Sequence, residues 1–263
     1  MDIFGVTDIG CVRKRNEDAI HWQALPGDDR FLAVLADGMG GYGGGALASK
    51  LAVEYFTKCV VSSLEFLSDY TNEQVMQVLS DAGSLANNAV RQERSNHPDF
   101  QKMGTTLIAM LIVEEEYWLM HAGDSRCYCA SGDGLQSMTR DHSLVQELLD
   151  KGSISEKEAE RAPFRNMLTR AVGPDSRVQF SFAKHHFQPD ESWLLCSDGL
   201  YNTLPAAVID HWMHCGLTAQ ETAAALVRES IRHNAQDNVS VIVLKQDATN
   251  RSKQYGHISA TGR

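Results

Sequence analysis

The chain is organised around Phe31-Leu32-Ala33-Val34-Leu35-Ala36-Asp37-Gly38-Met39-Gly40-Gly41. The six apolar residues, bounded by a glycine cluster, predict a buried strand. The strand brings the carboxylate of Asp37 to its end, next to residues without side chains. An aspartate in this position is held rigidly and can still reach solvent. We therefore expect a functional site at this end of the strand.

Three further apolar runs carry an aspartate at one tip: residues 117–122 lead into Asp124, residues 193–196 lead into Asp198, and residues 239–244 follow Asp237. Asp-Gly and Asp-Asn are good turn formers, so each single case has that simpler explanation. Four such runs, with Asn16-Glu17-Asp18 as a further acidic segment, instead favour a site where carboxylates gather.

The composition limits the classes of function. The 263 residues include 24 Lys and Arg against 34 Asp and Glu, which disfavours nucleic acid as a partner because such binding neutralises phosphates with basic residues. Gathered carboxylates repel each other unless a cation neutralises them, so part of the acidic excess fits a metal site. The Cys residues lack Cys-x-x-Cys spacing and predict reduced thiols. No secretory leader or membrane span is expected, which predicts a cytoplasmic protein.

Strand and helix patterns predict an α+β domain. Strands are expected at 2–7, 19–23, 31–36, 104–113, 117–122, 126–131, 135–138, 177–184, 192–197 and 239–245, and helices at 46–68, 72–95, 142–151, 155–161, after Pro205 and from Thr218. Thr71 with Gln74 and Thr218 with Glu221 predict capping boxes. Paired helices between runs of strands favour mainly antiparallel sheets. Residues 247–263 are polar and nearly featureless, which predicts a disordered tail.

Several chemistries are excluded by context. The match Gly38-x-Gly40-x-x-Gly43 to a dinucleotide fingerprint fails, because a second helix follows the first and Asp37 would repel a pyrophosphate. No nucleophile elbow or cysteine-phosphatase spacing is present, so covalent catalysis has no good candidate. Aspartates and main-chain oxygens without His or Cys suit Mg²⁺ or Mn²⁺ rather than zinc. Two such ions about 4 Å apart can generate hydroxide at neutral pH, which predicts a binuclear hydrolase.

The order of motifs resembles that of the metal-dependent protein phosphatases of the PP2C (PPM) family, closest to its compact bacterial members. The matching segments, which cover about residues 3 to 246, are Gly10–Asp18, Ala36–Gly41, Met103–Thr106, His121–Arg126, Cys196–Leu200 and Asp237–Ser240. The resemblance implies a four-layer α-β-β-α sandwich, with two central antiparallel sheets flanked by helical pairs and a metal site at one edge. Residues 1–246 would form this phosphatase domain.

The resemblance also implies an activity. It is Mg²⁺- or Mn²⁺-dependent hydrolysis of phosphoserine and phosphothreonine in proteins, by direct attack of a metal-activated water. The implied partners are phosphorylated proteins, including Ser/Thr kinases and their substrates, and the protein would act as a monomer. Two alternatives stay open: a phosphatase dedicated to one signalling protein, such as a phosphorylated anti-sigma antagonist, and a catalytically silent binding module. Retention of the matched aspartates argues against the silent module.

The resemblance assigns metal-binding roles to Asp18, Asp37, Gly38, Asp124, Asp198 and Asp237. Asp37 would bridge two ions and take part in catalysis, with the Gly38 carbonyl as another ligand. Asp198 and Asp237 would complete the shell of the first ion, and Asp18 would lie beside them with Glu17 behind. A third ion near Asp124 is an option.

Arg13 matches the family's phosphate-binding arginine, which would make it both a catalytic and a substrate-binding residue. Its alternative is a solvated side chain in a basic loop. Met39 stands where some members carry a histidine proposed as general acid, so protonation of the leaving group is unassigned and a metal-bound water is the natural substitute. Thr105 and Thr106 are interpreted as supporting the site. Residues 141–172 match the variable flap, with a packed helical hairpin as the alternative.

Overall fold

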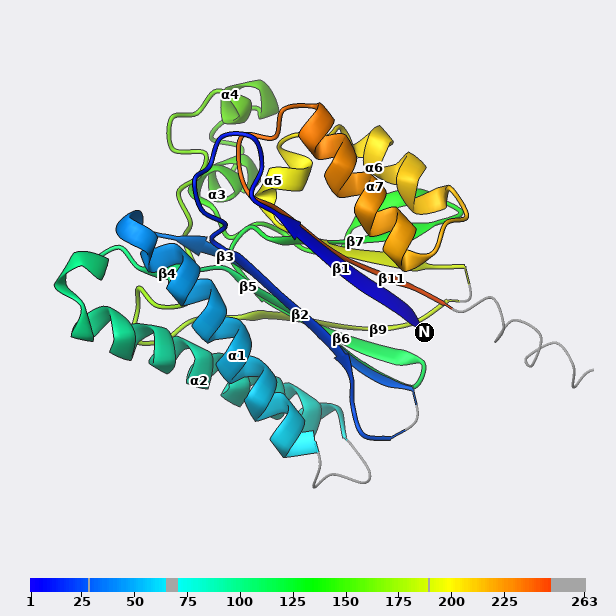
Figure 1. Ribbon diagram of the computed structural model, residues 1–263, viewed down its shortest axis with the longest axis horizontal. Coiled ribbons are helices and arrows are strands. Elements are labelled where there is room, and N and C mark those ends of the chain that lie inside the picture. The colour runs from blue at the N-terminus through cyan, green and yellow to red at the C-terminus, as the bar shows by residue number, and fades with distance from the viewer. Residues whose placement is uncertain (28, 65–70, 189, 247–263) are drawn as a thin grey trace, which may run out of the picture.

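The computed structural model describes residues 1–27, 29–64, 71–188 and 190–246 (Figure 1). The tail predicted at 247–263 and the predicted end of the first helix at 65–68 lie outside these ranges. None of the helices described is long and apolar enough to span a bilayer.

The described strands form two antiparallel sheets, one five-stranded and one six-stranded. In the first sheet the order is β1 (Asp2–Asp8), β11 (Val239–Lys245), β10 (Ser192–Cys196), β7 (Arg126–Ser131) and β8 (Gly134–Ser137). In the second it is β2 (Asp18–Ala24), β3 (Arg30–Met39), β5 (Leu107–Val113), β6 (Glu116–Ala122) and β9 (Ser181–His186), while β4 (Gly104–Thr105) pairs with the end of β3. The expected hairpins at 104–122 and 126–138 are both present.

Helices cover both outer faces of the stacked sheets, so the predicted four-layer sandwich is confirmed (Figure 1). Helices α1 (Gly44–Leu64) and α2 (Asn72–Asn96) pack on the second sheet. Helices α5 (Asp198–Tyr201), α6 (Ala206–His214) and α7 (Ala219–Arg232) lie on the first. The capping boxes predicted at Thr71 and Thr218 are both formed.

Residues 31–36 of β3 are all apolar because both faces of the strand are buried there. Leu32, Val34 and Ala36 face α1 and α2, whereas Ala33 and Leu35 face the other sheet. Side chains alternate between the two faces of a strand, so a strand in the middle of a four-layer sandwich needs apolar residues at every position. The continuous apolar run is therefore a direct signature of this layer.

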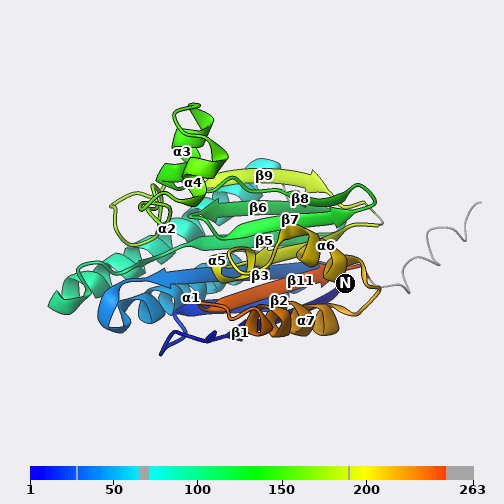
Figure 2. The same ribbon diagram turned by 90° about the horizontal axis from the view of Figure 1, so that it is seen from above.

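Residues 141–172 form a helical excursion between β8 and β9. It contains α3 (Leu144–Asp150) and α4 (Glu156–Glu160), both shorter than expected because Ser143 and Ser155 act as N-caps. Figure 2 shows α3 projecting beyond the strand layers.

Two expectations along the chain were inaccurate. Strand β9 begins at Ser181 rather than near residue 177, because Val178 and Phe180 pack against the cluster under α1 and α2 without joining the ladder. A Cβ at Gly83 of α2 would lie 2.6 Å from the Phe180 ring, so that ring occupies the space over the glycine. The short helix α5 was not anticipated, because four residues are too few to show helical periodicity.

Candidate metal centre

The alternation of side chains along the strands explains how the carboxylates meet. On β3, Asp37 follows Ala33 and Leu35 on the face between the sheets. Asp18 on β2 is paired directly with Asp37 across the ladder. The layer between the sheets is apolar along most of its length and becomes acidic at this one end.

Asp18 is fixed by hydroxyl groups from the opposite sheet. Ser197 and Ser240, both fully buried, donate through Oγ to Asp18 Oδ2 over 2.8 and 2.6 Å. Thr7 Oγ1 lies 2.7 Å from Ser240 Oγ and accepts from Asn16 Nδ2 over 2.7 Å, which extends the network to the surface loop. The second carboxylate oxygen, Asp18 Oδ1, is buried and has no hydrogen-bond partner among the described residues.

The charges of four predicted metal-site aspartates act on the fifth, Asp37. Burial raises the pKa of Asp37 well above its usual range, and the negative charges of Asp18, Asp198, Asp124 and Asp237 raise it further. Burial and three neighbouring carboxylates raise the pKa of Asp198 to about 8. Burial likewise raises the pKa of Asp18 to about 6 and that of Asp124 to about 6. These groups cannot all be ionised near neutral pH unless positive charge is supplied.

Two protein side chains donate hydrogen bonds to these aspartates in the structure. Arg13 Nη2 donates to Asp237 Oδ2 over 2.6 Å, and this hydrogen bond is the main cause that raises the Arg13 pKa. Asn202 Nδ2 donates to Asp198 Oδ2 over 3.1 Å. In this arrangement no group of three or more His, Cys, Asp or Glu side chains in the described ranges has a geometry that could hold a metal ion. Mg²⁺ is usually held by one or two carboxylates and several waters, so a site of this kind does not need a group of three such side chains.

The loop that carries Arg13 is tied to β11 by one buried amide. Asn238 Nδ2 donates to the carbonyl oxygens of Ile9 and Arg15 over 2.9 and 3.0 Å. Its Oδ1 accepts from the Glu17 backbone N–H over 2.8 Å. All three side-chain bonds of Asn238 thus hold residues 9–17 beside the aspartates.

Close backbone contacts leave no room for a side chain at two positions beside the aspartates. A Cβ on Gly38 would overlap the carbonyl oxygens of Gly45 and Glu17, so the chain after Asp37 fits against the start of α1 only with glycine. A Cβ on Gly199 would overlap the carbonyl oxygen of Asn238 in the same way. Both glycines lie directly after a predicted metal-binding aspartate.

Thr105 and Thr106 hold the backbone of Asp37, as the sequence predicted for supporting residues. Asp37 N–H donates to Thr106 Oγ1 over 2.8 Å, and its carbonyl oxygen accepts from Thr105 Oγ1 and from the Thr106 N–H, each over 2.8 Å. Thr106 Oγ1 also lies 2.7 Å from Ser125 Oγ, next to Asp124. The two hydroxyls therefore fix the backbone position from which the Asp37 side chain projects.

Asp124 lies in a loop braced by an aromatic residue and an arginine. Tyr201 on α5 donates its hydroxyl to the Asp124 carbonyl oxygen over 2.9 Å. The Arg126 guanidinium lies 3.6 Å from the centre of the Tyr201 ring and binds both oxygens of Asp141 over 2.9 and 2.8 Å. Besides burial, the charge of Asp141 contributes to the raised Asp124 pKa.

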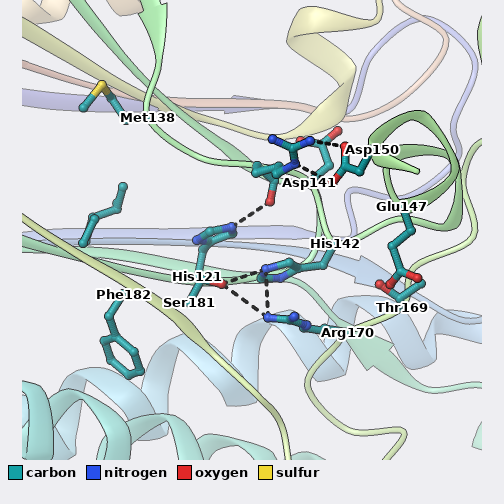
Figure 3. A pocket seen from close by; sticks show the side chains of 13 residues that line it. His121, Met138, Asp141, His142, Glu147, Asp150, Thr169, Arg170, Ser181 and Phe182 are labelled. Carbon is teal, nitrogen blue, oxygen red and sulfur yellow. Dashed lines mark hydrogen bonds and ion pairs between the residues drawn. The ribbon is translucent and has the colours of Figure 1, made fainter. Parts of the chain in front are cut away.

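The other side of this loop meets the base of the helical excursion (Figure 3). His142 binds Gly123 twice: its backbone N–H donates to the Gly123 carbonyl over 3.0 Å, and its Nδ1 accepts the Gly123 N–H over 3.2 Å. Its ring stacks on His121 at 4.4 Å between centroids and approaches Ser181 and Arg170. These groups line a cavity of about 290 Å³. Both histidines are satisfied within the protein, which leaves them outside the aspartate cluster.

Sequence reasoning did not single out Ser197, Ser240, Thr7 and Tyr201. Strand alternation could have identified the two serines. It places Ser197 and Ser240 on the same face as Leu195 and Ile242, which point into the layer between the sheets. Tyr201 acts from α5, which gave no signal in the sequence.

The residues present fit divalent cations with oxygen ligands. The candidate metal ligands are carboxylates and a carbonyl oxygen, which are the ligands that Mg²⁺ and Mn²⁺ prefer. The orphaned Asp18 Oδ1 is a buried acceptor, and an acceptor left without a partner costs about 1–3 kcal/mol. A cation would satisfy this oxygen and relieve the repulsion that raises the neighbouring pKa values.

Comparisons with known proteins support one family. The model of the family described as protein phosphatase 2C matches residues 12–240. The chain is 30% identical to the serine/threonine phosphatase stp of Listeria monocytogenes, over 94% of this chain and 96% of that protein. The structure of the serine/threonine phosphatase of S. agalactiae matches with a TM-score of 0.85 and 27% identity, over 93% of this chain and 99% of that one. The catalytic domain of PstP in complex with two manganese ions matches with a TM-score of 0.75 and 31% identity, over 92% of this chain and 96% of that one.

Proposed function

This chain belongs to the protein phosphatase 2C family of serine/threonine phosphatases, and on that premise we propose that it hydrolyses phosphoserine and phosphothreonine in proteins at a centre of two Mn²⁺ or Mg²⁺ ions. The observation that carries the proposal is the convergence of five aspartates, in which the charges of the other four help to raise the pKa of Asp37, together with the buried Asp18 Oδ1, which has no hydrogen-bond donor among the described residues.

The proposed ligands are Asp18, Asp37, the Gly38 carbonyl, Asp198 and Asp237, with Asp124 able to hold a third ion. Bound ions would neutralise the phosphoryl oxygens and lower the pKa of an attacking water. The carboxylates would then stay ionised at neutral pH, because the cations replace the protons that the raised pKa values indicate. The manganese-bound PstP structure supports this choice of ions.

Arg13 is proposed to bind the phosphate of the substrate. Its side chain is 52% exposed and bonded to Asp237, whose own side chain is 35% exposed, so the pair is accessible from solvent. An exposed ion pair contributes about 0–1 kcal/mol and is readily exchanged. The guanidinium can therefore leave Asp237 and bind two phosphate oxygens, while Asp237 becomes available as a ligand.

The proton for the leaving alcohol is assigned to a water molecule at the site. Met39 has no proton to give, and a Cβ on Gly104 would lie 2.8 Å from its Cε, so the Met39 side chain packs on β4. His121 and His142 are buried and are bonded to Arg140, Gly123 and Ser181, which removes them as candidates.

The remaining assignments follow from the same premise. The substrates would be phosphorylated proteins, among them Ser/Thr kinases and their targets, encountered by a monomeric enzyme in the cytoplasm. Residues 141–172 would act as a flap that selects protein substrates. The flap assignment is supported by its connection to the Asp124 loop through His142 and Gly123.

The test is metal-dependent hydrolysis by the purified protein. We expect turnover of p-nitrophenyl phosphate and of a phosphothreonine peptide with added Mn²⁺ or Mg²⁺, loss of turnover in EDTA, and recovery when the ion is returned. Full activity after exhaustive chelation would overturn the metal mechanism. Turnover of the aryl phosphate without any turnover of phosphopeptides would overturn the protein substrate.

A further inference from the structure

A hollow of about 300 Å³ lies at the C-terminal end of α2, lined by Arg91, Arg94, Ser95, Gln101, Gly173 and Pro174. None of these described lining residues is acidic. Neither arginine forms an ion pair in the part of the chain that the structure describes, although both are half-buried. In a protein of net charge −10, two partly buried arginines without a carboxylate partner make this hollow a positively charged site that suits an anion.

The hollow is held in a fixed shape. Arg94 Nη1 donates to the carbonyl oxygens of Gly173 and Pro174 over 3.3 and 2.9 Å, which satisfies oxygens that would otherwise repel an anion. Asn87 accepts the Gly173 N–H over 2.7 Å and donates to the Asp175 carbonyl over 3.0 Å. Arg91 lies one turn before Arg94 on α2 and makes no side-chain hydrogen bond to another described residue. Its guanidinium therefore remains available to a ligand.

Strand pairing sets the distance between the candidate metal centre and the near wall of the hollow, where the backbone leaves Val172. Gly38 pairs with Thr105, and Thr105 exchanges two backbone hydrogen bonds with Val172, over 2.9 and 2.8 Å. Neighbouring strands are about 4.8 Å apart, so Val172 lies about 10 Å from Gly38 across two such steps. Gly173 and Pro174 follow at once. An extended peptide rises about 3.3 Å per residue, so this distance corresponds to about three residues.

We propose that this hollow binds a negatively charged side chain of the protein substrate, about three residues from the phosphorylated Ser or Thr. This proposal rests on the proposed function. The shared chemistry is an anionic oxygen group, either the carboxylate of Asp or Glu or a second phosphate. Arg91 is the main donor, and Arg94 and Gln101 add hydrogen-bond donors at the walls. Arg91 is thus a residue that determines specificity, and it takes no part in the chemical step.

The experiment compares phosphothreonine peptides with the same core. One set carries Ala three residues before and three residues after the phosphothreonine, a second carries Asp at one of these positions, and a third carries phosphoserine there. Rates are divided by the turnover of p-nitrophenyl phosphate by the same variant. For the unmodified enzyme we expect kcat/KM about three- to tenfold higher with an anionic residue at one of the positions, as for charged hydrogen bonds partly screened by water. The second and third sets show whether carboxylate or phosphate is preferred.

Arg91→Glu should abolish or invert this preference, and Arg91→Ala should reduce it if the glutamate variant folds poorly. The matched control is Arg228→Glu, which makes the same charge change on an exposed position of α7. This control should keep the preference. Equal rates on neutral and anionic peptides by the unmodified enzyme, or an unchanged preference in Arg91→Glu, would overturn the inference while leaving the proposed function intact. No hydrolysis of any phosphate ester would overturn the proposed function, and the inference with it.

Discussion

Asp18 and Asp37 lie directly opposite each other on adjacent antiparallel strands, both facing the layer between the sheets. The Gly38 N–H donates to the Glu17 carbonyl over 3.1 Å, so the neighbouring pair carries the hydrogen bond and Asp18–Asp37 is a non-hydrogen-bonded pair. Such pairs have their Cβ atoms about 4.5–5.5 Å apart, and like charges there destabilise the sheet. Bound divalent cations, as proposed above, would offset this repulsion.

Asp37→Asn and Asp198→Asn should each lower kcat by orders of magnitude at saturating Mn²⁺, because an amide does not supply the charge that holds the ions. The measurement is turnover of p-nitrophenyl phosphate, together with Mn²⁺ affinity by calorimetry. Asp133→Asn, in an exposed turn, is the matched control and should behave like the unmodified enzyme. Near-normal turnover in either site variant would remove that aspartate from the proposed ligand set.

Arg13→Ala should reduce kcat/KM by about 1.5–3 kcal/mol of transition-state stabilisation, the value of a hydrogen bond to a charged group. Its melting temperature should stay nearly unchanged, since the bridge to Asp237 is largely exposed. Steady-state kinetics and a thermal melt test both statements. An unchanged kcat/KM would return Arg13 to the role of a solvated loop residue.

Ser240→Ala and Ser197→Ala should each weaken Mn²⁺ binding by about 10- to 100-fold, the usual cost of removing a group that orients a metal ligand. Each hydroxyl donates to Asp18 Oδ2, so its loss frees that carboxylate to rotate. The control is Ser230→Ala, which removes an equally buried hydroxyl that donates to Leu226 within α7. Equal Mn²⁺ affinity in the site variants and the control would show that the Asp18 network is structural only.

The metal-free protein should become more stable as the pH falls from about 8.5 to about 6.5. Burial raises the pKa of folded Asp198 to about 8, whereas an unfolded carboxyl titrates near 4, so the folded state binds more protons throughout this window. Below about pH 6.5 the effect should weaken, because burial lowers the pKa of His121 and His142 and the unfolded histidines then bind protons instead.

This pH dependence is measured by thermal melts in EDTA and in Mn²⁺. Saturating Mn²⁺ should reverse the trend, since the ion and the protons compete for the same carboxylates. Asp198→Asn should flatten the slope in EDTA. A metal-free melting temperature that rises steadily from pH 6.5 to 8.5 would contradict the expected direction of the effect.

Replacing Glu156, Lys157, Glu160 and Arg161 with Ala should alter rates on phosphopeptides and leave p-nitrophenyl phosphate turnover nearly unchanged, if residues 141–172 act as a flap. Glu158 is kept, because its carboxylate caps α4 by accepting the Ser155 N–H over 2.8 Å. Equal losses on both substrates would identify the segment as a support of the fold or of the site.

Helices and strands could be predicted from the sequence where a local pattern of residues has a single cause. The apolar run ending at Asp37 and the capping box at Thr71 each have one local cause, and both predictions are confirmed. The start of β9 was not predictable, because Phe180 alternates like a strand residue and yet packs on Gly83 of α2, a contact between distant segments. The convergence of Asp18 with Asp198 and Asp237 depends on stacking of the two sheets, which local sequence does not encode. The motif order supplied that information.

Gly38 and Gly199 leave no volume for even one methyl group, because a carbonyl oxygen occupies the place of each missing Cβ. At this end of the molecule, the tolerance of a position to substitution should therefore not depend on whether its side chain is reactive. In a saturation library, these two glycines, which have no side chain, should be as intolerant of replacement as the aspartates beside them, and alanine, usually the mildest change, should already be excluded there. Steric exclusion at these two glycines should restrict the sequence as strictly as charge does at the aspartates.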